Sequence, residues 1–270
     1  MDRRESLVRR SARLLETGSM EGTELARQVL GLSGPRAQVE SVLRTLLGTD
    51  ARFREDGFGR WSLVPDAALG GRRLGDLRYA VVDVETTGSS PRSGHRVTEV
   101  ALVEVRGSGR VDSFSTLVNP GRPIPRRIQA LTGITDRMVE QAPHFHEVAP
   151  ELLRRLEGRV FVAHNAPFDW RFVSAELARA GKEAPEGPRL CTVRLARRLL
   201  PGIRRHDLDT VTGHLGVPVA SRHRALGDAD ATAQVLLDLL ERARTAGVDR
   251  LSDLPGLARP SSGGEPSPRG

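Results

Sequence analysis

An apolar run that ends in two acidic residues constrains this chain more than any other feature. The run spans Tyr79 to Gly88 with the sequence YAVVDVETTG, and its β-branched content predicts a strand. Side chains two positions apart in a strand share a face, so Asp83 and Glu85 lie together. Two carboxylates this close need a proton or a cation, and their oxygens suit a hard divalent ion such as Mg²⁺ or Mn²⁺. The alternative for an isolated pair is a strand end in solvent with both acids hydrated.

A second acidic position follows a predicted strand-to-helix junction in the segment AHNAPFDWRF. His164 and Asn165 lie at the junction, where Asn165 is suited to cap the helix. Asp169 shares a helical face with the residues three, four and seven positions later, which points its carboxylate toward packed surface. A buried acid needs a cation or a hydrogen-bond partner. The alternative for Asp169 alone is a first-turn acid favoured by the helix dipole.

The third feature is the segment SRHRALGDADAT, where His223 precedes Asp228 by five residues at the start of the last predicted helix. Acids at a helix start are also expected from the dipole alone, and a lone histidine is often a surface residue. The four acids taken together favour a functional site over these separate explanations. Each of them, Asp83, Glu85, Asp169 and Asp228, occupies a strand end or a helix start. Glu176, Asp207, Asp209 and Asp230 are left out of the predicted site, since nothing in the pattern requires them.

The order of the predicted elements indicates an α/β domain over residues 79–243. Strands come first and most helices follow, which predicts a mixed sheet flanked by helices. The expected strands are 79–84, 97–105, 111–118 and 160–164, and the expected longer helices are 147–156, 167–180, 192–200, 208–215 and 228–242.

The first 64 residues have a different pattern, three short amphipathic helices followed by a hairpin around Asp56-Gly57. Thr23 is the expected N-cap of the second helix, and Pro35 lies near the start of the third. This order predicts a small winged-helix-like helical domain. Its third helix would either enter a DNA groove or form part of a protein-docking module with solvated arginines. Residues 65–78 are the expected linker, and 244–270 an extension that is largely disordered, because its end is rich in Pro, Gly and Ser.

Charge and cysteine content narrow the classes of partner and compartment. The chain has 41 Lys and Arg against 34 Asp and Glu, a net charge of +7, and Lys182 is its one lysine. Between 189 and 224 eight arginines stand against two aspartates, which favours phosphate contacts, although a solvated face explains such charge too. No apolar stretch reaches the ~18 residues of a membrane span, no secretory signal is evident, and Cys191 has no partner for an internal disulfide. We therefore expect a cytoplasmic protein that does not enter membranes.

Together the motifs DVETTG, HNAPFD and HRALGDA, in this order, resemble the signature of the DEDDh exonucleases. These are the DnaQ-like proofreading domains typified by the epsilon subunit of DNA polymerase III, with an RNase H-like fold. The resemblance implies that Asp83, Glu85, Asp169 and Asp228 hold two divalent ions, Mg²⁺ or Mn²⁺, and that His223 is the general base. It also implies a 3′→5′ exonuclease that releases nucleoside 5′-monophosphates.

The same resemblance implies that five residues near the acids contact the terminal nucleotide of the substrate. A purely structural role in a turn or a helix cap explains these residues equally well. They are Thr86, Thr87, Gly88, His164 and Asn165. The expected partner is nucleic acid with a free 3′ end, DNA in preference to RNA because of the winged-helix-like segment, with a polymerase or a repair protein as a possible second partner. Two alternatives stay open. One is an exoribonuclease or oligoribonuclease, and the other is a DNA-binding scaffold with a vestigial nuclease domain.

Overall fold

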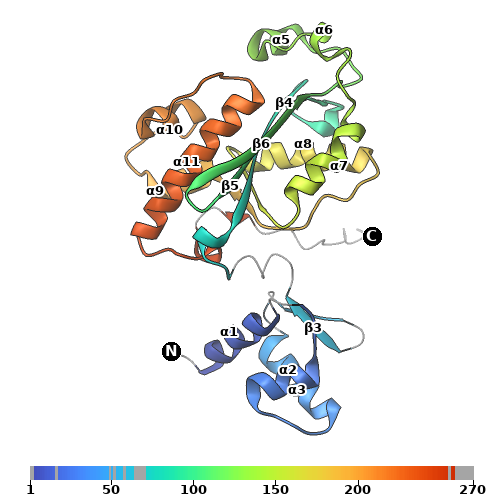
Figure 1. Cartoon of the computed structure of the whole chain (residues 1–270), viewed down its shortest axis with the longest axis vertical. Coiled ribbons are helices and arrows are strands. Elements are labelled where there is room, and N and C mark those ends of the chain that lie inside the picture. The colour runs from blue at the N-terminus through green and yellow to red at the C-terminus, as the bar shows by residue number, and fades with distance from the viewer. Residues whose placement is uncertain are drawn as a thin grey trace, which may run out of the picture. The chain divides into compact units, whose positions relative to one another are not determined.

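The computed structural model describes residues 3–15, 18–48, 50, 53–56, 59–63, 71–254 and 257–258. The chain divides into two compact units, Met1–Arg72 and Arg73–Gly270. Figure 1 shows the helices and strands of both units.

In its described residues, the first unit contains three helices and a three-stranded antiparallel sheet of order β1-β3-β2. Its core is apolar, with Leu25, Leu43, Leu47 and Trp61 almost completely buried. The expected cap at Thr23 is wrong, because the second helix begins at Gly22, two residues earlier than expected, and no side chain caps it. Gly57, in the expected hairpin turn, lies outside the described residues. The elements are α1 (Arg3–Leu15), β1 (Met20–Glu21), α2 (Gly22–Leu30), α3 (Arg36–Leu47), β2 (Phe53–Glu55) and β3 (Arg60–Leu63).

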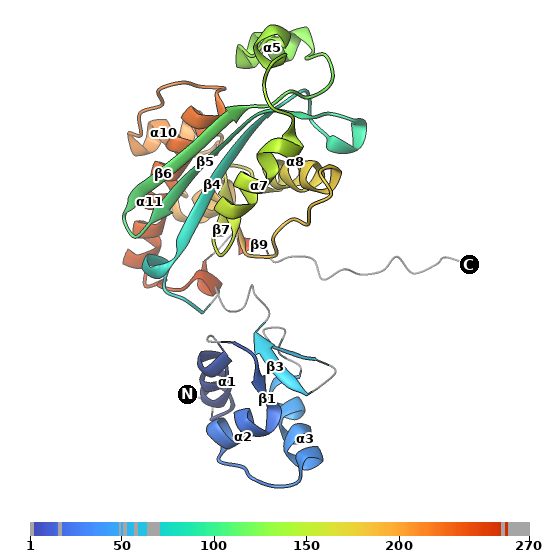
Figure 2. The same ribbon diagram turned by 45° about the vertical axis from the view of Figure 1, so that its right-hand side comes forward.

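The second unit is built on a six-stranded mixed sheet of order β6-β5-β4-β7-β8-β9. Figure 2 shows β6, β5 and β4 side by side in this sheet. The β4–β5, β5–β6 and β8–β9 pairs are antiparallel, and the β4–β7 and β7–β8 pairs are parallel. The mixed sheet expected from the sequence is therefore present, with two further short strands, β8 and β9. The strands are β4 (Arg78–Thr86), β5 (Val97–Arg106), β6 (Gly109–Leu117), β7 (Val160–Ala163), β8 (Arg189–Cys191) and β9 (Leu257–Ala258).

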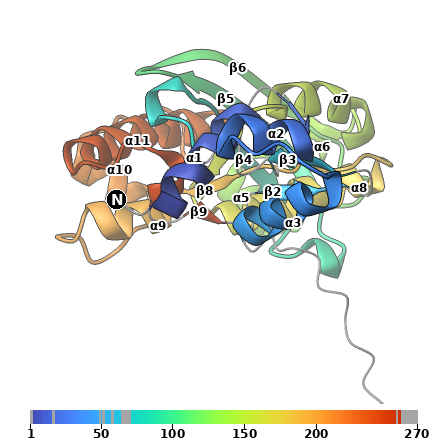
Figure 3. The ribbon, with the colours of Figure 1, turned by 90° about the horizontal axis from the view of Figure 1, so that it is seen from below.

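Helices cover both faces of this sheet. Figures 1 and 3 show α9, α10 and α11 on one side and α7 and α8 on the other. No helix within the described ranges is long and apolar enough to cross a membrane. The α-helices are α5 (Arg126–Thr132), α6 (Asp136–Val139), α7 (Phe145–Leu156), α8 (Ala166–Arg179), α9 (Thr192–Leu199), α10 (Leu208–Leu215) and α11 (Ala225–Thr245), and the 3₁₀ turns are η1 (Leu74–Asp76), η2 (Pro91–Ser93) and η3 (Leu251–Asp253).

The two-residue period of β4 divides its side chains between the faces of the sheet. Ala80, Val82 and Val84 belong to the apolar core beneath α7 and α8. The intervening residues, which include Asp83 and Glu85, face the other way, and α11 packs on β4 there. The central strand β5 is buried at every position but its last, as expected for a strand covered on both faces. The strand therefore offers its acids to the α11 side while its apolar residues hold the core together.

Two predicted boundaries differ from the structure. The last part of the expected linker, 73–78, belongs to the second unit, where Leu74 and Leu77 are buried and β4 begins at Arg78. The start of the expected disordered extension is ordered as well. There Leu251 and Leu254 are buried, and β9 pairs with β8. Leucines in both segments fill the core, which outweighs the local signals of glycine and proline. Residues 64–70, 255–256 and 259–270 lie outside the described ranges.

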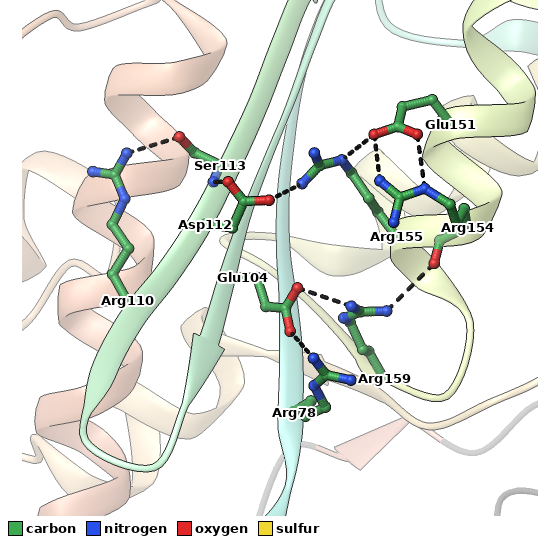
Figure 4. A network of polar contacts seen from close by, with 9 residues as sticks. All are labelled: Arg78, Glu104, Arg110, Asp112, Ser113, Glu151, Arg154, Arg155 and Arg159. Atoms are coloured by element: carbon green, nitrogen blue, oxygen red, sulfur yellow. Dashed lines mark hydrogen bonds and ion pairs between the residues drawn. The ribbon is translucent and has the colours of Figure 1, made fainter.

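Ion pairs connect the start of β4 to β5 and to the end of α7 (Figure 4). Glu104, on β5, is buried, forms an ion pair with Arg78 at 3.0 Å and accepts a hydrogen bond from Arg159 at 2.8 Å. Arg155, on α7, donates to Asp112 of β6 at 2.7 Å. Arg78 is the first residue of β4, and Asp83 and Glu85 lie in its second half. This network therefore braces the end of the sheet opposite the acidic positions.

Candidate active site

Strand β4 presents its two acids where its pairing with β5 becomes irregular. Asp83 pairs in register with Ala101 and Glu85 with Glu99, and a bulge of β5 follows, because Thr98 is an extra residue between the partners of Glu85 and Thr86. A bulge bends its strand and re-aims the side chains beside it, and bulges are frequent next to functional sites. Both carboxylates are partly exposed on the α11 side of the sheet. The expectation that they share one face agrees with this register.

Helix α8 brings the third acid to the same place. Asp169 lies in the first turn of α8 and is 4% exposed. Asn165 precedes the helix in the left-handed conformation, with φ of 93°, and its side chain makes no capping hydrogen bond. The expected cap is therefore wrong. In its place the Asn165 carbonyl accepts from the amide of Phe168 at 2.8 Å.

The loop before α11 supplies the fourth acid and the histidine. Asp228 lies in the first turn of α11, which begins three residues earlier than expected, and accepts from the backbone amide of His223 at 3.1 Å. His223 has a φ of 59°. A Cβ at Gly227 would overlap the Ser221 carbonyl, so only glycine lets this loop pack so closely. His223 and Asn165 are the residues other than glycine with positive φ among those described, and left-handed conformations of this kind concentrate at functional sites.

All four acids and His223 line one cavity of about 540 Å³. Ligand atoms of Glu85, His223 and Asp228 lie within 4.8 Å of one another. The structure thus brings together every residue that the sequence analysis assigned to catalysis. The cavity is lined by Asp83, Val84, Glu85, His164, Asn165, Phe168, Asp169, Val193, Arg197, His206, Asp207, Leu208, Arg222, His223 and Asp228.

The acids raise one another's affinity for protons. Burial and the charges of Asp169, Glu85 and Asp228 hold the pKa of Asp83 well above its usual range. Burial and the charge of Asp228 raise the pKa of Glu85 to about 7. Burial raises the pKa of Asp169 to about 8, although backbone amides that bond its carboxylate oppose the shift. Carboxylates that lie this close together and bind protons this readily are suited to divalent metal ions. Bound metal ions would take the place of the protons in neutralising the negative charge.

Arg222 supplies one cation to this cluster. Its Nη1 donates to Oδ1 of Asp228 at 2.5 Å, and its Nε and Nη2 donate to Asp209 of α10. Burial opposes the charged guanidinium, but these bonds to Asp209 and Asp228 raise the pKa of Arg222. The same positive charge lowers the proton affinity of Asp83 and Glu85. Arg222 therefore partly offsets the repulsion among the acids.

His164 is fixed by two hydrogen bonds to the protein. Nε2 lies 3.0 Å from the carbonyl oxygen of His206, and Nδ1 lies 2.9 Å from the hydroxyl of Thr192. A carbonyl only accepts, so the Nε2 proton is assigned, and Nδ1 of the neutral ring accepts from Thr192. Burial lowers the pKa of His164 to about 4, which keeps the ring neutral at pH 7. These bonds join the end of β7 to the start of α9 and to the 206–208 loop of the cavity wall.

The residues after the acids form a turn and do not line the cavity. The Thr86 hydroxyl donates to the Gly88 carbonyl at 2.7 Å. The Thr87 hydroxyl accepts from the amide of Arg96 at 3.0 Å, and its own amide donates to the Arg96 carbonyl at 2.8 Å. A Cβ at Gly88 would overlap the ring of His95, which packs against it. In this structure Thr86, Thr87 and Gly88 therefore hold the loop that leaves β4.

Two buried acids that were left out of the predicted site, Glu176 and Glu99, bind arginines of the segments that flank the cavity. Glu176 of α8 accepts from Nε and Nη2 of Arg96 at 2.7 and 2.9 Å, and is 1% exposed. Glu99 accepts from Nη2 of Arg224 at 2.8 Å and from the Ala225 amide at 2.9 Å, at the start of α11. The signal for Glu176 was its place on the inward face of α8 with Asp169. For Glu99 the sequence offered only an acid inside an apolar strand.

The arginines between 189 and 224 divide into paired and unpaired groups. Arg222 and Arg224 are bound to acids of the site, and Arg205 pairs with Asp207 at 3.0 Å. Arg197 lines the cavity and, like Arg198, is exposed on α9 without an ion pair to any described residue. Uncompensated positive charge therefore remains at the α9 side of the cavity.

Comparison with known protein families and sequences gives one consistent result. A family model described as Exonuclease matches residues 80–236. The chain is 41% identical over 187 residues to a DNA polymerase III subunit epsilon-like protein of Rhodobacter capsulatus, covering 68% of this chain and 26% of that protein. It is 38% identical over 182 residues to the 3′-5′ exonuclease DinG of Bacillus subtilis, covering 67% of this chain and 20% of that protein. The chain thus spans about a quarter or less of the length of these relatives.

Solved structures show the same fold. Exonuclease X, solved in complex with 5′ overhanging duplex DNA, is 33% identical with a TM-score of 0.51, covering 63% of this chain and 93% of that one. The nuclease domain of 3′hExo, a DEDDh family member bound to rAMP, is 18% identical with a TM-score of 0.55, covering 63% of this chain and 94% of that one. The second likeness shows the fold alone.

Proposed function

The chain belongs to the exonuclease family whose model matches residues 80–236, and on that premise we propose that it is a metal-dependent 3′→5′ exonuclease acting on DNA. The observation that carries the proposal is the meeting of four carboxylates and His223 at one cavity. The proposed substrate is a single-stranded or frayed 3′ end, and the proposed product a nucleoside 5′-monophosphate. We favour DNA over RNA as the substrate because relatives named for DNA polymerase III align with about two thirds of this chain.

Asp83, Glu85, Asp169 and Asp228 are the proposed ligands of two divalent ions, Mg²⁺ or Mn²⁺. Such ions, when bound, activate a water for attack and stabilise the leaving 3′ oxygen. This acid cluster fits them because its proton affinities are raised and its donors are oxygens.

His223 is the proposed general base. Its ring lies beside Glu85 and Asp228, and histidine is the side chain that most often transfers protons in enzyme active sites. The left-handed backbone at His223 and the hydrogen bond from its amide to Asp228 fix the loop that aims the ring. His164 is neutral and bonded on both ring nitrogens, which leaves it a wall of the substrate pocket and not a proton carrier. Asn165, exposed at the cavity edge, is the proposed contact to the terminal nucleotide.

For the first unit we propose a winged-helix-like module. Arg36 and Arg44 of α3, its outward cations, are bonded to Glu40 and Glu55 at 2.7 Å. Charges satisfied in this way have less to gain from phosphates, which favours protein docking over DNA contact. A polymerase or a repair protein is the proposed partner class, and the cytoplasm is the proposed compartment.

The test is degradation of 5′-labelled DNA and RNA of one sequence in Mg²⁺, Mn²⁺ or EDTA. We expect a metal-dependent ladder that shortens from the 3′ end on DNA, and none with Asp83→Asn, which keeps the side-chain shape but removes a ligand charge. A ladder on RNA alone would show that the substrate is RNA and that the protein is an exoribonuclease. No ladder on either polymer in any metal would contradict the proposal.

A further inference from the structure

A second and larger hollow, of about 810 Å³, lies on the opposite face of α8 from the catalytic acids. Three of the residues that line it are arginines and none is acidic: Ser90, Pro91, Arg92, Arg171, Ser174, Ala175, Ala178 and Arg179. No residue lines both this hollow, here called the α8 groove, and the catalytic cavity. The two sites are therefore separate surfaces to which one helix, α8, contributes residues.

The helical period explains how α8 serves both surfaces. Asp169 begins a series at positions i, i+3, i+4 and i+7 that is buried, and Arg171 begins a second such series that lines the α8 groove. Two residues correspond to about 200° around a helix, so the two series point in nearly opposite directions. The other wall of the groove is the η2 turn, in the loop that leaves β4 just after Glu85.

This wall is held firmly against α8. Nη2 of Arg179 donates to the Pro91 carbonyl at 3.0 Å, and Arg179 also lies 3.5 Å from buried Glu176. Glu176 in turn holds Arg96 at the far end of the same loop. The groove is thus formed by packed elements, and Arg179 is used in forming it.

Arg92 and Arg171 are left with their charge free. Both side chains are exposed, and neither forms an ion pair with any residue that the structure describes. The hydroxyl of Ser174 donates to the Trp170 carbonyl at 2.6 Å, so the guanidinium groups are the donors that face a ligand, and two alanines add little bulk to the lining. A groove with unpaired guanidinium groups, small side chains and no acid suits phosphate oxygens, which match the planar donors of arginine.

We propose that the α8 groove binds the phosphate backbone of the nucleic acid whose 3′ end occupies the catalytic cavity, through Arg92 and Arg171. The proposal rests on the proposed exonuclease function. A helix with its side chains is about 10–12 Å across, and one strand of a duplex rises about 3.4 Å per nucleotide. A few nucleotides therefore span from the cavity to the groove. The phosphates come either from the strand being degraded or from its complement.

The experiment measures binding of DNA to the full chain on the Asp83→Asn background, which prevents degradation. The groove variant is Arg92→Gln with Arg171→Gln. The matched control is Arg106→Gln with Arg242→Gln, which removes the same charge from exposed positions at the other end of β5 and late in α11. One DNA is a single-stranded 12-mer, and the other is the same strand with a recessed 3′ end paired to a longer complement.

We expect the groove variant to bind more weakly than the control. If the degraded strand supplies the phosphates, the slope of log affinity against log salt on the single strand should fall by about 1.4, from two lost contacts at about 0.7 each. A loss on both DNAs assigns the phosphates to the degraded strand, and a loss on the duplex alone assigns them to the complement. Equal affinities and slopes for the groove variant and the control on both DNAs would overturn the proposal.

A small substrate separates this proposal from the proposed function. A nitrophenyl ester of thymidine 5′-monophosphate reaches the catalytic cavity without reaching the groove. With Asp83 intact, the groove variant should hydrolyse this ester at the unsubstituted rate while degrading the 12-mer more slowly. If the unsubstituted protein hydrolyses the ester but groove and control variants behave alike on DNA, only the groove proposal fails. If the unsubstituted protein hydrolyses neither substrate, the exonuclease function itself fails.

Discussion

Arg222 donates from Nη1 to Oδ1 of Asp228 at 2.5 Å, so a proposed metal ligand is already bound to a cation of the protein itself. The other edge of the guanidinium is held by Asp209 of α10. Arg222 thus reduces the repulsion among acids whose pKa values are raised by burial and by one another. A metal ion that binds Asp228 has to share this carboxylate with Arg222 or displace it.

Replacing Arg222 should separate stability from metal affinity. We expect Arg222→Gln to lower the free energy of unfolding in EDTA by about 2 kcal/mol, because charge-assisted hydrogen bonds are lost and the acids repel more strongly. Affinity for Mn²⁺ should rise about tenfold, or about 1.4 kcal/mol, since no guanidinium competes for Asp228. Calorimetric titration and urea unfolding measure the two quantities.

The matched control is Arg154→Gln, which breaks an exposed arginine–glutamate pair within α7. It should change neither quantity measurably, because exposed pairs of this kind contribute little. An Mn²⁺ affinity that Arg222→Gln leaves unchanged would show that Arg222 does not compete with the metal.

The metal-free protein should lose stability as the pH rises toward and through about 7 to 8. The pKa of Glu85 is about 7 and that of Asp169 about 8 in the folded protein, against about 4 for these groups in an unfolded chain. The folded state therefore holds protons that the unfolded state has released, and the free energy of unfolding falls as pH rises through about 7 and 8. His164 acts in the opposite sense, since its pKa is lowered to about 4, but only below about pH 6.5.

The clear window for this measurement is therefore pH 6.5 to 8.5. Urea unfolding in EDTA at several pH values should show a falling free energy of unfolding. Saturating Mn²⁺ should flatten the curve, because bound ions replace the protons. A flat curve in EDTA would mean that the acids are already ionised at neutral pH.

The sequence was most informative where a local period decides which way a side chain points. Asp83 and Glu85 were predicted on one face from the two-residue period of a strand, and Asp169 on an inward face from the helical period. The structure agrees with both. That these acids meet Asp228 and His223 came from the resemblance of three motifs, because no local pattern shows which distant segments become neighbours.

The residues that hold these acids escaped prediction for the same reason. Glu176 and Arg96 are 80 positions apart, and Glu99 and Arg224 are 125 apart. Their pairing is visible only after the sheet has formed. The short strands β8 and β9 were missed because two or three residues carry no measurable period. Leu251 and Leu254 were assigned to a disordered extension because the composition of the whole tail obscured two leucines that the core buries.

His223 should be replaced by asparagine and not by alanine when its role is tested. Its φ of 59° strains most side chains, whereas asparagine tolerates the left-handed region. We expect His223→Asn to lower kcat by about 10²–10⁴-fold through loss of the general base. The free energy of unfolding and the Mn²⁺ affinity should change little. A loss of rate below about threefold would assign proton transfer to another group.

Glu176 should prove to be a structural anchor of the loop that joins β4 to β5. Glu176→Gln removes the charge that holds Arg96 and weakens the acceptor for the Val97 amide at 3.2 Å. Breaking a fully buried ion pair costs about 3–5 kcal/mol, and Arg96 keeps some access to water, so we expect a loss of about 2–3 kcal/mol. Arg96→Met should restore part of this loss in the double variant, because no unpaired charge then remains.

Amide hydrogen exchange tests whether this anchor reaches the active site. In the unsubstituted protein the amide of Thr87 is bonded to the Arg96 carbonyl at 2.8 Å, within the loop that follows Glu85. Glu176→Gln should speed exchange across residues 87–96 and leave the ion-paired start of β4 protected. If exchange in this loop stays slow, Glu176 stabilises α8 but does not anchor the loop. The two hydrogen bonds between Thr87 and Arg96 would then be sufficient to hold the loop.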